Sequence, residues 1–322
     1  MAARFPIAWA FVDDAPFFSR LEGHLVGRAA WRLARRLPGQ AQFGRYLERV
    51  ATDFCPDIVI VVKGAHIDPK VLERIKARTR ARFVNYATDD PFNLRNSTPA
   101  LLASIPIYDL YASPRRANLG DLTAKGARHV AFVRFGYKPE LHFPEAAHGG
   151  QGSRFDADLA FIGGCDETRA LFVEEILRRM PRLKLALYGG YWDRSRLFRS
   201  FYRGFAVGRD FRLAVSGARI VLNLVRRANR DGHVMRTFEV PACGGCMLAE
   251  RTQEQLELFE DGREAVFFDD VEEMVARVEW LLKDESARQR IALAGLRRVR
   301  DGRHTYADRL HELLSLAEEI LA

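Results

Sequence analysis

The chain has 322 residues, a length typical of two domains, and its 48% apolar residues can form a core in each. No apolar run reaches the ~18 residues that would span a membrane, and the N-terminus lacks the pattern of a secretory signal. The four cysteines are too few for a disulfide framework, so we expect a reducing cytoplasm.

The net charge of +8 is concentrated in the first half of the chain. Residues 1–145 hold 22 Lys and Arg against 14 Asp and Glu, whereas residues 146–322 hold 28 of each class. Within the second half, residues 178–236 carry 15 basic and 3 acidic side chains. This distribution favours an anionic acceptor or an anionic surface as partner, unless the arginines only solvate helix faces.

The first half alternates apolar runs with amphipathic stretches, a pattern that predicts a parallel sheet flanked by helices. Its clearest buried strand, 58–62, ends at Lys63-Gly64-Ala65-His66. In chain order we expect a strand at 7–12, a basic helix at 24–37, a strand at 58–62, a helix at 69–80, and strands at 82–86, around Leu110 and at 130–135.

Residues 139–156 are rich in His, Gly and Pro without apolar periodicity, which predicts an interdomain linker. After it we expect strands at 159–162, 183–188, 220–225, from Met247 and at 265–268, and helices at 167–179, 237–243, 271–283 and near 305–321. The chain is therefore predicted to form two domains, 1–145 and 146–322, with the final helix as an element that could return to the first.

The most informative stretch is 231–249, where a strand, a loop, a short helix and another strand follow one another. Such a loop lies at the carboxyl edge of a parallel sheet, where open α/β sheets bind ligands. Backbone N–H groups at the start of the helix favour a diphosphate. Glu239, one turn into the helix, could accept two hydrogen bonds from a ribose diol or could simply cap its own helix.

This stretch, with Asp231 and Glu239 separated by seven residues and Cys243-Gly244-Gly245 after them, resembles the nucleotide-sugar site of GT-B glycosyltransferases. Residues 256–268 are similar to the segment that follows the donor site in group 1 members. Lys63-Gly64 and Asp89-Asp90-Pro91 are similar to motifs of the CgeB-like, spore-maturation type. One departure is Asp231, because many retaining members have glutamate there.

The resemblance implies an α/β fold of two Rossmann-like domains with a central cleft, the GT-B fold. It implies metal-independent transfer of a sugar from a nucleotide-diphosphate sugar, UDP-linked in our expectation, to an acceptor hydroxyl, with no cofactor. The C-terminal domain would hold the donor and the N-terminal domain the acceptor.

The implied roles fall into three groups. Donor-binding residues are Gly163, Gly164, Tyr188, Asp231, Gly232, His233, Arg236, Thr237 and Glu239. Acceptor-binding residues are Lys63, Gly64 and His66, and the catalytic candidates are Asp89, Asp90 and His233. Ordinary alternatives remain open, since glycine pairs and Asp-Asp-Pro also form tight turns and Arg236 could pair with Glu239 or Asp231. No metal site is expected, because Cys243 and Cys246 have no second cysteine pair.

Two other functions compete with this prediction. A GT-B-fold epimerase would use the same nucleotide site to convert the sugar itself. A non-catalytic basic module would bind an anionic membrane or nucleic acid. The helix bearing Arg28, Trp31, Arg32, Arg35 and Arg36 fits a peripheral contact with the inner face of the membrane, useful for a lipid-linked acceptor. The sequence contains no groove-reading element, which argues against nucleic acid.

Overall fold

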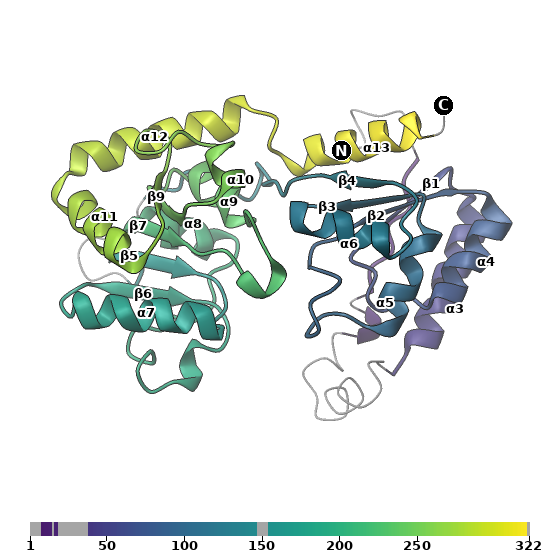
Figure 1. Cartoon of the computed structure of the whole chain (residues 1–322), viewed down its shortest axis with the longest axis horizontal. Coiled ribbons are helices and arrows are strands. Elements are labelled where there is room, and N and C mark those ends of the chain that lie inside the picture. The colour runs from purple at the N-terminus through teal and green to yellow at the C-terminus, as the bar shows by residue number, and fades with distance from the viewer. Residues whose placement is uncertain (1–7, 15, 19–37, 147–153, 321–322) are drawn as a thin grey trace. The chain divides into compact units, whose positions relative to one another are not determined.

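A computed structural model describes residues 8–14, 16–18, 38–146 and 154–320 of the chain. The chain divides into two compact units, each built around a parallel sheet (Figure 1). The first unit comprises Met1–Arg134, Ala228–Arg230 and Leu310–Ala322. The second comprises Phe135–Arg227 and Asp231–Arg309.

The first unit contains a four-stranded parallel sheet in the order β1-β2-β3-β4. Its strands are β1 (Ile58–Val62), β2 (Arg82–Tyr86), β3 (Leu110–Ser113) and β4 (Val130–Phe132). Its described helices are α3 (Gln40–Phe54), α4 (Pro69–Thr79), α5 (Pro99–Ser104), α6 (Leu119–Ala124) and the part of α13 (Tyr306–Glu319) from Leu310 onward.

Apolar clusters cover both faces of this sheet, because successive side chains of a strand point to opposite sides. Phe83 of β2 belongs to the cluster that includes Leu72 and Ile75 of α4. Val84, the next residue of β2, belongs to the cluster that includes Leu313 of α13. The final helix is thus part of the first unit, although the chain reaches it only after completing the second.

The predicted strand at 7–12 is wrong for its described part, since residues 8–13 form no strand. The predicted basic helix at 24–37, with its five membrane-contact residues, lies outside the described residues. The strand predicted at 130–135 is shorter, because Phe135 already packs into the core of the second unit.

The second unit contains a five-stranded parallel sheet in the order β6-β5-β7-β8-β9. Its strands are β5 (Ala157–Ile162), β6 (Leu185–Tyr188), β7 (Ala218–Asn223), β8 (Met247–Glu250) and β9 (Val266–Phe268). Its described helices are α7 (Glu167–Arg179), α8 (Arg209–Ser216), α9 (Arg236–Ala242), α10 (Gln253–Leu256), α11 (Val271–Lys283) and α12 (Glu285–Asp301). As in the first unit, strands alternate with helices in the Rossmann-like manner.

The change from one unit to the other falls after Arg134, whereas the sequence placed it after residue 145. The physical reason is burial: Phe135 and Tyr137 are 3% and 4% exposed and belong to a core cluster of the second unit. A bridge between Tyr137 and Thr305 holds this segment next to the start of α13. Within the predicted linker itself, Glu145 bonds to Arg209 and Arg212 of α8, so this described part also belongs to the second unit.

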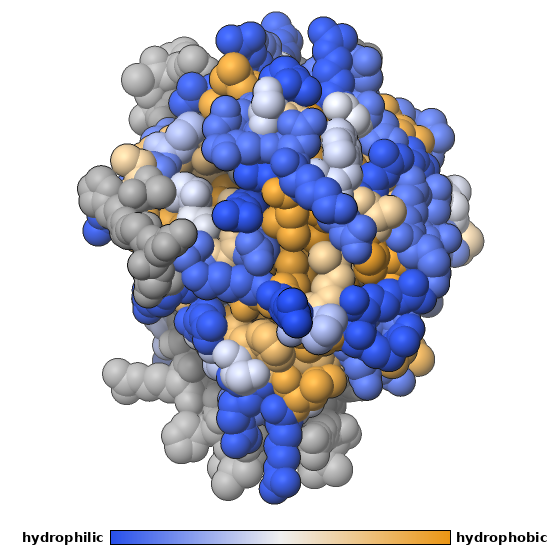
Figure 2. Space-filling model, turned by 90° about the vertical axis from the view of Figure 1, so that its left-hand side faces the viewer, coloured by the Kyte–Doolittle hydropathy of each residue, from blue (hydrophilic) through white to orange (hydrophobic). Residues whose placement is uncertain are grey.

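Hydrophilic residues cover most of the face of the molecule that Figure 2 shows, with a strip of apolar residues near its centre. Single exposed leucines occur on two helices of the second unit, Leu171 on α7 and Leu293 on α12. None of the helices in the described ranges is long and apolar enough to cross a membrane.

We expect Gly189→Ala to lower the free energy of unfolding by roughly 2–4 kcal/mol. Gly189 has a φ of 118°, and a Cβ atom there would lie 2.5 Å from the Gly163 carbonyl oxygen at the end of the neighbouring strand. The mutation therefore adds a clash with backbone to a left-handed conformation. Urea unfolding followed by circular dichroism measures the change.

Gly204→Ala is the matched control, because Gly204 has a φ of 87° but no atom within 4 Å of the added Cβ. It should cost only about 1 kcal/mol, the penalty of the left-handed conformation. Equal losses for the two variants would contradict the close approach of the β5 and β6 ends.

Candidate functional site

The strand order of the second sheet identifies one position at its edge as the place for a ligand. After β5 the chain adds β6 on one side and β7 on the other, so the connections leave β5 and β7 in opposite directions. Ligands of open α/β sheets bind at this switch point, beyond the carboxyl ends of the strands. Gly163 and Gly164 follow β5, and Leu224 follows β7.

A buried arginine joins these two strand ends. Arg169, near the start of α7, is 8% exposed and donates to the carbonyl oxygens of Gly164 at 3.2 Å and Leu224 at 2.9 Å. Its guanidinium group places positive charge at the switch point. Arg169 was not among the predicted site residues, because an arginine on an amphipathic helix is normally expected on its solvent-exposed face.

The two glycine turns predicted to border the donor meet at the ends of β5 and β6. Gly163 N–H donates to the Tyr188 carbonyl oxygen at 2.8 Å, and Cys165 N–H donates to the Gly190 carbonyl oxygen at 2.9 Å. A side chain at Gly189 would separate the turns, because its Cβ atom would lie 2.5 Å from the Gly163 carbonyl oxygen. Tyr188 itself is 1% exposed and donates its hydroxyl to the Arg154 carbonyl oxygen at 3.1 Å. Burial raises the pKa of Tyr188 to about 12.

Glu239 lies in the first turn of α9 and forms an ion pair with Arg236. Arg236 also donates from Nε to the Ile162 carbonyl oxygen of β5 at 3.1 Å, and its guanidinium group stacks 4.7 Å from the ring centroid of Phe211. The start of α9 is thereby tied to the switch point. Arg236 thus pairs with Glu239, which is one of the alternatives left open by the sequence. Any ligand that binds the Glu239 carboxylate therefore binds a group that already has a cationic partner.

Further side chains surround Glu239. His142 places Nε2 at 3.6 Å from Glu239 Oε1. Burial raises the pKa of Tyr306, and the charge of Glu239 raises it further. Burial also raises the pKa of Cys243 and of Cys246 to about 12, which leaves both as inert thiols. Within the described ranges, no group of three or more His, Cys, Asp or Glu side chains could hold a metal ion.

His233 is fully buried, and both of its ring nitrogens have partners. Phe135 N–H donates to Nε2 at 3.1 Å, so the ring proton lies on Nδ1, which donates to Glu254 Oε2 at 2.5 Å. Gly232 packs against the same Glu254 carboxylate, and its carbonyl oxygen accepts from the Thr252 hydroxyl. This geometry assigns His233 and Gly232 to the support of the loop and does not present the imidazole to a substrate.

Two other predicted donor residues are also largely interior. Thr237 is fully buried, and its hydroxyl oxygen accepts from Asn223 Nδ2 and from Val234 N–H, both at 3.2 Å. Asp231 is 9% exposed, and its N–H donates to the Arg226 carbonyl oxygen at 3.4 Å. Together they shape the loop that leads from β7 to α9.

In the first unit, the predicted acceptor and catalytic residues meet at the carboxyl ends of β1 and β2. Lys63 Nζ lies 2.8 Å from Asp89 Oδ2, and Asn229 donates to Asp89 Oδ1 at 3.2 Å. Burial opposes ionisation of Asp89, but the hydrogen bond and charge of Lys63 outweigh it and lower the pKa of Asp89. Gly64, with a φ of 77°, packs against Val61. The His66 ring packs against Phe18 at a tilt, with the ring centroids 4.9 Å apart.

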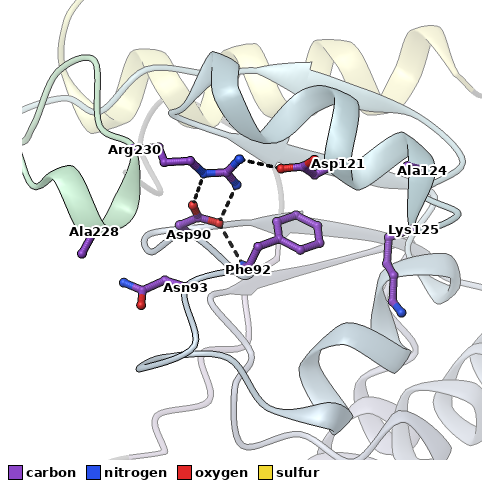
Figure 3. Close-up of a pocket in the computed structure, with 8 residues that line it drawn as sticks. All are labelled: Asp90, Phe92, Asn93, Asp121, Ala124, Lys125, Ala228 and Arg230. Atoms are coloured by element: carbon purple, nitrogen blue, oxygen red, sulfur yellow. Dashed lines mark hydrogen bonds and ion pairs between the residues drawn. The ribbon is translucent and has the colours of Figure 1, made fainter.

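Asp90, directly after Asp89, is 1% exposed, and its carboxylate bonds to neighbouring residues of the first unit (Figure 3). It accepts from Asn118 Nδ2 at 2.6 Å and pairs with Arg230 at 2.7 Å, and Arg230 also pairs with Asp121. Asp90, Arg230 and Asp121 are among the residues that line an open pocket of about 550 Å³. The other lining residues are Phe92, Asn93, Ala124, Lys125 and Ala228.

Comparison with known proteins supports the fold. Residues 169–315, less than half of the chain, match the model of a family described as glycosyl transferase-like. A comparison with curated protein sequences finds no match. Among solved structures, the chain is similar to HepE of Anabaena in complex with UDP-glucose, with a TM-score of 0.62 and 12% identity over 86% of this chain and 82% of that one.

Two further solved structures are similar to the chain over most of its length. A sucrose-phosphate synthase from Thermosynechococcus elongatus has a TM-score of 0.66 and 10% identity, over 88% of this chain and 78% of that one. A glycosyltransferase from Rickettsia africae has a TM-score of 0.57 and 10% identity, over 93% and 88%. At such identities the likeness establishes the fold: α/β, with two Rossmann-like domains, the GT-B fold.

We expect His233→Ala to lower the free energy of unfolding by roughly 2–4 kcal/mol, because it leaves the Phe135 N–H and the Glu254 carboxylate without their buried partner. Urea unfolding at pH 7.5 measures the loss. Glu279→Ala, at an exposed position of α11, is the control and should change stability by no more than about 0.5 kcal/mol. Unchanged stability together with lost turnover would instead restore a catalytic role to His233.

Proposed function

We propose that this protein is a glycosyltransferase that moves a sugar from a UDP-sugar to an acceptor hydroxyl without a metal ion. The observation that carries the proposal is the Arg236–Glu239 pair at the switch point of a GT-B donor-type sheet. The glycosyl transferase-like match over residues 169–315 includes this pair. The UDP and UDP-glucose in the complexes of Anabaena HepE support the choice of nucleotide.

In this proposal the second unit binds the donor. Glu239 accepts the ribose hydroxyls, and the backbone at Gly163 and Gly164 approaches the diphosphate. Arg169 and Arg236 supply the positive charge that stabilises the departing diphosphate, a task that other enzymes give to a metal ion. Asp231, on the loop between β7 and α9, contacts the transferred sugar in this proposal.

The first unit binds the acceptor. Asp89 is half-buried and ionised, and it is held by Lys63 and Asn229, so its carboxylate is suited to orienting an acceptor hydroxyl. Its lowered pKa makes it a weak general base, so we assign it orientation before proton abstraction. The motifs at Lys63-Gly64 and Asp89-Asp90-Pro91 support a CgeB-like member, and the low cysteine content favours the cytoplasm as its compartment.

We expect UDP to stabilise the protein by roughly 1–3 kcal/mol at concentrations well above its dissociation constant, and Glu239→Gln to remove most of this effect. The reason is that the amide has no charge and keeps only one of the two acceptor oxygens of the carboxylate. Thermal unfolding with UDP, GDP and ADP measures the shift. EDTA should leave it unchanged.

A wild-type protein that no nucleotide stabilises would contradict the donor site. Product analysis with UDP-sugar alone separates the two enzymatic possibilities, because an epimerase converts the donor without any acceptor.

We expect Asp89→Asn to lower kcat at least tenfold while the dissociation constant of UDP stays within about twofold. Asp89 belongs to the acceptor side, so donor binding does not depend on its charge. Steady-state kinetics and calorimetric titration with UDP measure the two quantities. Asp53→Asn, at an exposed position of α3, is the control. A weaker affinity for UDP in Asp89→Asn would argue against this division of labour.

A further inference from the structure

The segment 138–146, which we call the strap, is fastened to α8 of the second unit. Glu145 accepts from Arg209 Nε at 3.1 Å and from Arg212 Nε at 2.6 Å. Arg212 also donates to the Leu141 carbonyl oxygen at 3.1 Å. The hydrogen bonds from Arg212 and Arg209 lower the pKa of Glu145, so the carboxylate stays charged at neutral pH. The strap therefore has its own anchors on both sides of residue 142.

His142 is the residue that the strap directs toward the donor site. The Lys138 N–H donates to His142 Nδ1 at 3.1 Å, which assigns the ring proton of the neutral imidazole to Nε2. Nε2 lies 3.6 Å from Glu239 Oε1, and the ring packs edge to face on Phe211 with centroids 5.5 Å apart. The imidazole is thus fixed by backbone and by an aromatic ring with its N–H directed at the carboxylate.

The imidazole remains neutral at physiological pH. Burial lowers the pKa of His142 below its ordinary value, Glu239 opposes this effect, and the guanidinium groups of Arg236 and Arg212 lower the pKa further. A neutral imidazole presents a directed N–H group to Glu239. Because it carries no positive charge, it does not neutralise the carboxylate.

We propose that His142 is a positioning residue for Glu239, which it orients toward the ribose diol of the donor. This inference rests on the proposed function. A carboxylate has about four lone-pair sites. Arg236 bonds Oε2, and His142 Nε2 lies 3.6 Å from Oε1, beyond a hydrogen bond but close enough to restrict rotation of the carboxylate, which keeps lone pairs for the two ribose hydroxyls. Because both neighbours are held by other contacts, the carboxylate is arranged before the ligand arrives, which lowers the entropy lost on binding.

The anchors of the strap separate this role from a merely structural one. Glu145 and the Leu141 carbonyl hold the strap without the imidazole, so His142→Ala should leave the fold intact. A loss that acts through Glu239 should depend on the ribose hydroxyls of the ligand. A loss caused by a displaced strap should weaken all nucleotides alike.

The test compares UDP with 2′-deoxy-UDP by calorimetric titration of wild type and His142→Ala. We expect the dissociation constant of UDP to rise about fivefold in the variant, because Glu239 loses one of the two side chains that hold its orientation. The dissociation constant of 2′-deoxy-UDP should rise no more than about twofold, so the preference for the ribose form shrinks. His142→Gln keeps an N–H donor of similar reach and should restore most of that preference.

Glu140→Ala is the matched control, because Glu140 is exposed on the same strap and should leave both affinities unchanged. Equal weakening of both nucleotides in His142→Ala would overturn the proposal in favour of a structural role, and no weakening of either would also overturn it. If the wild-type protein binds no nucleotide, the proposed function itself fails. That outcome is seen before any variant is made.

Discussion

The candidate donor site depends on a buried hydrogen-bond network centred on Glu254. This carboxylate accepts from His233, which in turn accepts from the Phe135 backbone, while Gly232 packs against it too closely for any side chain. The network joins the loop before α9 to the first residues of the second unit. It therefore sets where α9 begins, and with it the positions of Arg236 and Glu239.

A second constraint is the way that charge is compensated. In the first unit the two neighbouring carboxylates have separate cations, Lys63 for Asp89 and Arg230 for Asp90. Asp90 is almost fully buried and multiply bonded, which suits a structural task, whereas Asp89 keeps an accessible edge. Two adjacent residues of the same type can thus have different roles, because their burial and partners differ.

The sequence predicted the regular elements best where apolar periodicity was strong. The strand at 82–86 and the helices at 167–179 and 271–283 have the predicted bounds. The helices α3 and α12 were not predicted, and α12 is rich in arginine, so its apolar stripe is narrow. The described part of the predicted linker is held to the second unit by contacts such as Glu145 with Arg212, which is 67 residues away in the chain. Periodicity contains no information about such contacts.

The sequence by itself determined the α/β alternation, the two parallel sheets and the position of Glu239 one turn into a helix after a buried strand. These follow from local patterns, since a strand, a turn and a helix are each encoded within a few neighbouring residues. Only the tertiary structure decided which side chains from distant parts of the chain gather around the switch point and the loop before α9. Arg169, His142 and Glu254 lie far from Glu239 or from its loop in sequence, and their roles depend on burial and on distances across the fold. The same tertiary packing placed His233 in the interior, where both of its ring nitrogens have protein partners.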